Sequence, residues 1–375
     1  MQIERDTHLV LAKLPTTHYL LCKVKRWLEP LWMKLGTLET RLLAASLSCK
    51  PVDRPIYVMG LARSGTTITL DFLSKHGDVA THRYHDMVQP YLPFVWNWVL
   101  RRLPLPAENP KERLHKDGLY VTRESPEAVE EVIWNKFFPD LYDESCSAVL
   151  DANTSNPAFH SFYRATIVKL LLAYQRPRYL SKANYNLTRL AYLVRLFPDA
   201  RIIVMVRRPV AHFASWVKQH ELFLRTQAHD PRWIETIRMV GHCEFGHDNR
   251  FVNAGDTELV LEIRKAWDCG ERAYAFGLYW ASMYGQVFDL VERDPLVRAA
   301  VLFVRYEDLC ANPRITMERM LAHVQLDVTT YRAVFEEYEG KLAAPQYYRS
   351  KLDSVELQAL DRTTQAVATR LGYAD

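Results

Sequence analysis

A short loop of small residues separates an expected strand at 56–59 from an expected helix at 66–76, with the sequence Gly60-Leu-Ala-Arg-Ser-Gly65-Thr-Thr. Backbone N–H groups at the start of a helix can bind an anion, and the two glycines have the spacing of a P-loop. However, Thr66 stands where a loop that binds a nucleoside triphosphate has its lysine, and the cation lies inside the loop, at Arg63. Because that lysine neutralises the β- and γ-phosphates, the loop predicts a phosphate site that does not hold a triphosphate with magnesium. A glycine-containing turn without a ligand is the alternative interpretation.

A second candidate anion site follows the expected strand at 200–206, a nearly continuous apolar run. Arg207 would lie at the carboxyl end of this strand, where open α/β sheets bind ligands. Ser215 comes eight residues later, about two turns into a helix opened by Pro209. Both side chains could therefore contact one phosphate group. An arginine paired with an acid and a solvated serine are the alternative interpretation.

Together the two elements resemble the 5′-phosphosulfate loop and the 3′-phosphate motif of the sulfotransferase superfamily, and its bacterial-type members most closely. The resemblance includes the spacing between Arg207 and Ser215, the Arg-x-Pro context, and a third patch at 304–309 after a last expected strand. It covers about residues 55–325. It implies that the 5′-phosphosulfate is bound by Arg63, Ser64, Gly65, Thr66 and Thr67, and the 3′-phosphate by Arg207 and Ser215.

The activity implied by the resemblance is a sulfuryl transfer. The donor and co-substrate would be 3′-phosphoadenylyl sulfate (PAPS), and no other cofactor or metal is expected. The sulfuryl group would move by in-line displacement to a hydroxyl or amine of a small-molecule, glycan or lipid acceptor, with release of adenosine 3′,5′-bisphosphate.

The chain departs from the cytosolic branch of the superfamily at two places. That branch has Lys-Thr-His before its second phosphate motif, with the histidine as base, whereas this chain has Lys182-Ala-Asn184. Lys182 therefore remains a candidate catalytic cation beside Arg63, and the base must come from elsewhere. The branch also has a Gly-rich basic motif near its C-terminus, for which Tyr347-Tyr-Arg-Ser-Lys351 is the candidate substitute here.

Candidates for the base lie about twenty residues after the phosphate loop, where other branches of the superfamily have a carboxylate. This window follows an expected strand at 79–81 and contains His82, His85 and Asp86. Histidine titrates near neutrality, at ~6.5, whereas an aspartate would need a raised pKa. In an extended segment, alternation places His82 and Asp86 on one side and His85 on the other. We expect His82 and Asp86 to be catalytic, with His85 kept open as a further base and a purely structural role as the alternative.

The segments around these motifs alternate between strand and helix, which predicts an α/β fold with a P-loop-like parallel sheet and helices on both faces. Residues 1–50 are expected to form a helical extension of two amphipathic helices, and residues 51–375 the main domain. Within that domain the sequence predicts helices at 126–138, 157–174 and 188–197 and strands at 178–182 and 299–304. The polar, poorly periodic segment 221–256 is expected to be a flap over the site, where His242, Glu244 and His247 could line an acceptor pocket.

Composition excludes several classes of protein. The 48 Lys and Arg against 44 Asp and Glu give a net charge of only +4, so no polyanion-binding surface and no nucleic-acid partner are expected. No run of 18 apolar residues predicts a membrane span. The basic N-terminal segment with Trp27 and Trp32 leaves a peripheral membrane contact open. Six scattered cysteines without a CxxC pair favour reduced thiols, and with no evident secretory signal we expect a cytoplasmic protein.

Two competing functions remain open at this point. A P-loop-type kinase shares the expected sheet and the glycine spacing, but it would need magnesium and a replacement for the missing loop lysine. It would also leave Arg207 and Ser215 unexplained. A non-catalytic nucleotide-binding relative would bind adenosine 3′,5′-bisphosphate without turnover.

Overall fold

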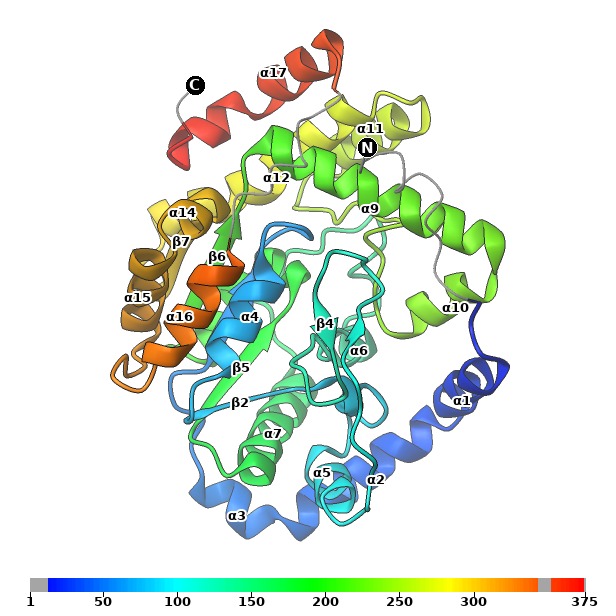
Figure 1. The fold of residues 1–375 in the computed structure, drawn as a ribbon, viewed down its shortest axis with the longest axis vertical. Coiled ribbons are helices and arrows are strands. Elements are labelled where there is room, and N and C mark those ends of the chain that lie inside the picture. Colours follow the sequence, from blue (N-terminus) through cyan, green and yellow to red (C-terminus); the bar gives the residue numbers. More distant parts are fainter. Residues whose placement is uncertain (1–12, 343–351, 374–375) are drawn as a thin grey trace.

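A five-stranded parallel sheet forms the centre of the molecule. The computed structural model describes residues 13–342 and 352–373, and among these the strands follow the order β2-β5-β1-β6-β7. All four neighbouring pairs are parallel, which confirms the predicted α/β class (Figure 1). The strands are β1 (Ile56–Met59), β2 (Val79–Thr81), β5 (Arg178–Lys182), β6 (Arg201–Val206) and β7 (Val301–Arg305).

Alternation of side chains along the central strands divides the interior into two cores. In β1, Ile56 and Val58 belong to one buried cluster, and Tyr57 and Met59 belong to the other. Successive side chains of a strand point to opposite faces, so a strand that is apolar throughout must be covered on both sides. This is the physical reason why the central strands β1, β5 and β6 are almost fully buried.

Helices cover both faces of the sheet. On one face the core is completed by α4 (Thr66–Ser74), α15 (Pro313–Val324) and α16 (Arg332–Lys341). On the other it is completed chiefly by α7 (Pro157–Tyr174), α8 (Leu190–Leu196) and α12 (Arg272–Arg293). The helix expected at 188–197 begins as a 3₁₀ turn, η3 (Asn184–Arg189), before α8.

The remaining elements lie around this three-layered body (Figure 1). They are η2 (Tyr84–Met87), α5 (Pro93–Leu100), the two-stranded hairpin β3 (Lys111–Glu112) and β4 (Tyr120–Val121), α6 (Glu131–Phe137), α9 (Pro209–His229), α10 (Arg232–Met239), α11 (Thr257–Asp268), α13 (Pro295–Ala300), α14 (Tyr306–Ala311) and α17 (Ser354–Arg370). No helix in the described ranges is both long enough and apolar enough to cross a bilayer.

Two sequence-based predictions about these elements were wrong. The helix expected from Pro126 begins only at Glu131, because Pro126 pairs with Arg83 in an isolated β-bridge and the hydroxyl of Ser125 accepts the N–H of Thr122. The flap expected at 221–256 is helical in its first part: Glu221 to His229 complete α9, and α10 follows. The buried residues of this part have helical spacing: Leu222, Phe223, Thr226 and Gln227. Because two of the four are polar, the apolar residues alone do not show the helical period. Only residues 240–256 are irregular.

The N-terminal extension consists of three helices rather than two. α1 (Thr16–Trp27), α2 (Glu29–Leu42) and α3 (Ala44–Cys49) follow one another almost without interruption along the base of the molecule in Figure 1. A buried ion pair fastens α2 to α7: Nζ of Lys169 lies 3.0 Å from Oε2 of Glu39, with side chains 1% and 2% exposed. The same Nζ donates to the carbonyl of Gly36 at 2.7 Å.

We predict that Glu39→Ala lowers the free energy of unfolding by about 3–5 kcal/mol, because it leaves the buried ammonium of Lys169 without its counter-charge. Burial already lowers the pKa of Lys169, against the opposing charge of Glu39. Urea unfolding followed by circular dichroism measures the change. Glu318→Ala is the matched control: its partner Arg314 lies 2.9 Å away but both side chains are nearly half exposed, so the loss should stay below about 1 kcal/mol. Equal losses in the two variants would contradict the prediction.

Candidate functional site

The loop after β1 is closed so tightly that two of its positions require glycine. Gly60 has φ +151° and Gly65 has φ +101°, conformations that side chains rarely adopt. A Cβ on Gly60 would lie 2.4 Å from the carbonyl oxygen of Met205, and one on Gly65 would lie 2.5 Å from the ring of Tyr306. The loop is therefore pressed against the end of β6 and the start of α14.

The predicted site residues come from four strand ends that meet at one edge of the sheet. The phosphate loop follows β1, His82 follows β2, Lys182 ends β5 and Arg207 follows β6. Because parallel strands end at the same edge, residues far apart in sequence gather there.

Direct contacts join the two predicted anion-binding elements. The side chain of Arg63 donates from Nε to the hydroxyl of Ser215 at 3.2 Å. The side chain of Arg207 donates from Nη1 to the carbonyl of Arg63 at 3.1 Å and lies over the ring of Tyr306. The helix α9 positions Ser215 by placing it on its buried side. The loop and the second element therefore form one continuous polar surface.

An arginine and an aspartate that the sequence analysis missed complete this surface. They lie in the hairpin connection between β3 and β4. Asp117 bridges two cations: its Oδ2 accepts from Arg63 at 2.8 Å, and its Oδ1 accepts from Arg113 at 2.9 Å. Arg113, only 8% exposed, also donates to the hydroxyl of Thr67 at 3.3 Å. In the sequence this is an ordinary opposite-charge pair four residues apart, so only the fold identifies it.

Charges within this cluster shift the pKa values of its members. Burial would raise the pKa of Asp117, but the hydrogen bonds and charge of Arg113 and the charge of Arg63 hold it well below the ordinary range. Burial chiefly lowers the pKa of Lys182, with the charges of Arg113 and Arg63 adding to it, and the charges of Glu127 and Glu244 oppose that shift. Lys182 is 7% exposed, so its ammonium is held in a low-dielectric environment where charge interactions are strong.

The position compared with the family histidine is occupied by Asn184, and its amide continues the polar surface. Its Oδ1 accepts from the hydroxyl of Thr66 at 3.3 Å, and its Nδ2 donates to Oε1 of Glu244 at 2.9 Å. Glu244 in turn lies 3.4 Å from Nδ1 of His242. Of the residues expected to line an acceptor pocket, Glu244 contacts Asn184 directly and His242 contacts Glu244, whereas the N–H of His247 donates to Gln227.

The expected geometry of the base candidates was wrong in one respect. Residues 84–87 form a 3₁₀ turn, so alternation does not separate the two histidines. Nδ1 of His82 lies 3.5 Å and Nδ1 of His85 3.2 Å from the carboxylate of Asp86, which is fully buried. Asp86 also accepts from the backbone N–H of Arg83 and from Asn97.

These contacts favour a structural role for Asp86. Burial would raise its pKa, but the hydrogen bonds from His82 and His85 lower it, which is opposite to the shift that a general base requires. Within the described ranges, neither His82 nor Asp86 contacts the phosphate loop.

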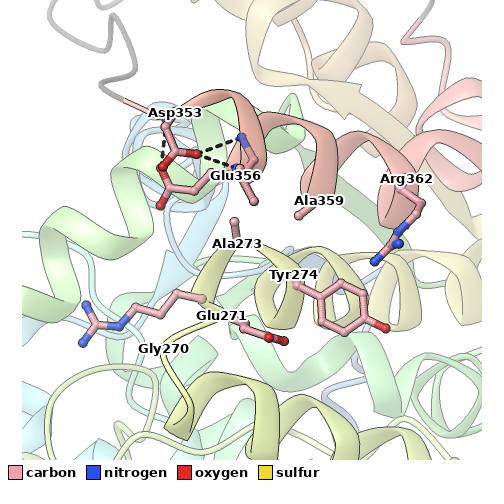
Figure 2. A pocket seen from close by; sticks show the side chains of 10 residues that line it. Gly270, Glu271, Ala273, Tyr274, Asp353, Glu356, Ala359 and Arg362 are labelled. Carbon is pink, nitrogen blue, oxygen red and sulfur yellow. Dashed lines mark hydrogen bonds between the residues drawn. The ribbon is translucent and has the colours of Figure 1, made fainter.

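A hollow elsewhere on the molecule shares no residue with this surface. It lies between the start of α12 and the start of α17, and Figure 2 shows Glu271, Tyr274, Asp353 and Arg362 around it. Asp353 caps α17 through the N–H groups of Val355 and Glu356, so its carboxylate is already used. The segment 347–351, expected to complete the 3′-phosphate site, lies outside the described residues.

We predict that Gly60→Ala lowers the free energy of unfolding by more than about 2 kcal/mol, since the added methyl group meets the backbone of β6 and the conformation is strained. Thermal unfolding measures the loss. Gly118→Ala is the control: its φ is +80° but nothing lies within 4 Å of the added Cβ. The only expected loss there is about 1 kcal/mol of unfolding free energy from backbone strain. A loss in Gly60→Ala no larger than in Gly118→Ala would show that the loop is not held against β6.

Comparisons with known proteins point to one family. The profile of the sulfotransferase family matches residues 55–247. An uncharacterized protein of Aquifex aeolicus (strain VF5) is 26% identical over 187 residues, which are 49% of this chain and 20% of that protein. The chain thus spans about a fifth of the length of this curated relative.

Two solved bacterial structures are similar to this chain. Sulfotransferase STF9 from Mycobacterium avium is 16% identical, with a TM-score of 0.51 over 88% of this chain and 81% of its own. Sulfotransferase STF1 from Mycobacterium tuberculosis H37Rv is 15% identical, with a TM-score of 0.45 over 90% and 81%. At these identities the structural likeness concerns the fold alone. The family profile covers more than half of the chain, and on that ground the chain belongs to the sulfotransferase family.

Proposed function

We propose that this protein transfers a sulfuryl group from PAPS to a hydroxyl or amine and releases adenosine 3′,5′-bisphosphate. The observation that carries the proposal is the contact of Arg63 with Ser215 and of Arg207 with the carbonyl of Arg63. It joins two anion-binding elements 144 residues apart into one surface, which suits a ligand with phosphate groups at both ends of a nucleoside.

The residues available fit such a donor. The N–H groups of Gly65, Thr66 and Thr67 at the start of α4 would bind the 5′-phosphosulfate together with the hydroxyl of Ser64, whose own N–H donates to the carbonyl of Leu61. Arg207 with Ser215 would bind the 3′-phosphate. Asp117 between Arg63 and Arg113 supports this assignment, because a carboxylate held by two arginines marks a place where negative charge is stabilised.

In the proposed reaction, the chain's main contribution is to stabilise charge. As the bond between sulfur and the bridging oxygen breaks, negative charge builds on the 5′-phosphate, and Arg63 and Lys182 would neutralise it. The absence of a lysine at position 66 disfavours a kinase, whose triphosphate would lack its usual cation. The acceptor class, whether small molecule, glycan or lipid, and a cytoplasmic location remain parts of the proposal.

Arg207→Ala is predicted to weaken the binding of adenosine 3′,5′-bisphosphate by about 10–100-fold, because a charge-assisted hydrogen bond contributes about 1.5–3 kcal/mol. Isothermal calorimetry with and without magnesium measures it, with adenosine triphosphate and adenosine 5′-monophosphate for comparison. The control is Arg208→Ala, since the neighbouring side chain is exposed and lies over Tyr373 instead; its affinity should equal that of the wild type.

Magnesium-dependent binding of the triphosphate, with no binding of the bisphosphate, would overturn the proposal in favour of a kinase. Binding of the bisphosphate without turnover of PAPS in any acceptor screen would favour a non-catalytic relative.

Lys182→Met is predicted to reduce turnover of PAPS by about 10²–10³-fold, the usual effect of removing one group that stabilises transition-state charge. The affinity for adenosine 3′,5′-bisphosphate should change less than threefold, because the residue would act on the bond that breaks. Release of the bisphosphate from PAPS is the assay, and the exposed Lys265→Met is the control. Unchanged turnover in Lys182→Met would remove this residue from the mechanism.

A further inference from the structure

A chain of polar contacts leads from the phosphate loop to a histidine in the irregular segment 240–256. Thr66 donates to Asn184 at 3.3 Å, Asn184 donates to Glu244 at 2.9 Å, and the second oxygen of Glu244 lies 3.4 Å from Nδ1 of His242. Each contact uses a different atom of the shared residue. The position of His242 is therefore tied, through two intervening side chains, to the first residue of α4.

The two nitrogens of His242 have different surroundings. Nδ1 faces a carboxylate that is 11% exposed, whereas the imidazole as a whole is 32% exposed. Within the described part of the chain, Nε2 forms no hydrogen bond. A histidine with one nitrogen held by a buried carboxylate and the other open to a ligand has the arrangement of a general base.

The other candidates lack this combination. His82 is 2% exposed, His85 9% and Asp86 0%, so a proton acceptor at these positions would be closed to an acceptor molecule. Their nitrogens and oxygens also serve one another and the backbone of Arg83. Residues 82–86 therefore have no exposed histidine nitrogen that an acceptor could reach.

Resting on the proposed function, we propose that His242 is the general base of the sulfuryl transfer and that Glu244 and Asn184 position it. Nε2 would take the proton of the acceptor hydroxyl while an oxygen lone pair of the acceptor forms the new bond to sulfur. The bond from sulfur to the bridging oxygen breaks, and its electron pair stays on the 5′-phosphate of adenosine 3′,5′-bisphosphate. The imidazolium then returns its proton to water.

Several charged groups act on His242 from the elements around it. Glu244 lies on its own segment, Glu127 precedes α6, Lys182 ends β5 and His115 belongs to the hairpin connection. Burial would lower the pKa of His242 and Lys182 adds to this, but the hydrogen bond and charge of Glu244, with the charge of Glu127, raise it above its ordinary value. Burial would in turn raise the pKa of Glu244, and His242 and Asn184 lower it to about 2.

The sign of the pH dependence follows from these shifts. A base works only when it is unprotonated, so turnover should fall as the pH drops through the raised pKa of His242. In Glu244→Gln the carboxylate is lost and the pKa of His242 falls, so the inflection of kcat/KM should move to lower pH. The plateau should fall as well, because the ring is no longer held in one tautomer. A merely structural role would lower the plateau without moving the inflection.

The test compares His242→Gln with His160→Gln, an exposed histidine of α7 that lies outside the proposed site. Calorimetry with adenosine 3′,5′-bisphosphate is measured first, and it should give wild-type affinity in both variants. Single-turnover release of the bisphosphate from PAPS is then followed with phenols, alcohols and amines as acceptors, and with water alone. His242→Gln should lose about 10²–10⁴-fold and His160→Gln less than threefold.

Nuclear magnetic resonance of ring-labelled histidine tests the same inference without turnover. The resonance missing in His242→Gln identifies the residue, and its pKa should lie above about 6.5, fall in Glu244→Gln and change when the bisphosphate binds. A His242 that titrates alike in wild type and Glu244→Gln overturns the inference. So does turnover of His242→Gln within threefold of wild type, whereas failure of the wild type to bind the bisphosphate would refute the proposed function itself.

Discussion

The close approach of Gly60 to the carbonyl of Met205 is the constraint on which the rest of the site depends. A Cβ at position 60 would lie 2.4 Å from the carbonyl oxygen of Met205 in β6. The loop after β1 can therefore lie against β6 only if residue 60 is glycine. The hydroxyl of Tyr284 reinforces this seam by accepting from the N–H of Leu61 and donating to the same carbonyl. Because Arg207 follows β6 directly, the seam also brings the two predicted anion-binding elements into contact.

Charge balance at the edge of the sheet is the second organising feature. Arg63 and Arg113 share Asp117, and Lys182 lies within the influence of Glu127 and Glu244. Unpaired charges are costly to bury, and each of these three cations is already held near an acid. Such pairing keeps the cations in place in a preorganised arrangement, and it implies that a bound donor competes with Asp117 for the two arginines.

The irregular segment after α10 is held in place by contacts that its composition alone does not indicate. It folds over the end of β5 because specific polar contacts fix it there: Asn184 binds Glu244, and the hydroxyl of Tyr185 accepts the N–H of Cys243. Gln227 accepts the N–H of His247 from the buried side of α9. Loops positioned in this way by a rigid sheet commonly carry binding and catalytic residues.

The sequence by itself determined the class of fold and the positions of the central strands, because these depend on local signals such as apolar runs. It also predicted two phosphate motifs from glycine spacing and from residues at strand ends. The sequence-based predictions were wrong for the helix expected at Pro126, because that residue forms a β-bridge to Arg83. They were also wrong for the flap, because buried polar residues in α9 interrupt its apolar period. Only the tertiary structure decided which side chains complete the site. The contact of Asp117 with Arg63 and that of Asn184 with Glu244 join segments up to 60 residues apart. Such contacts arise because parallel strands end at one edge of the sheet, and no local spacing in the sequence encodes them.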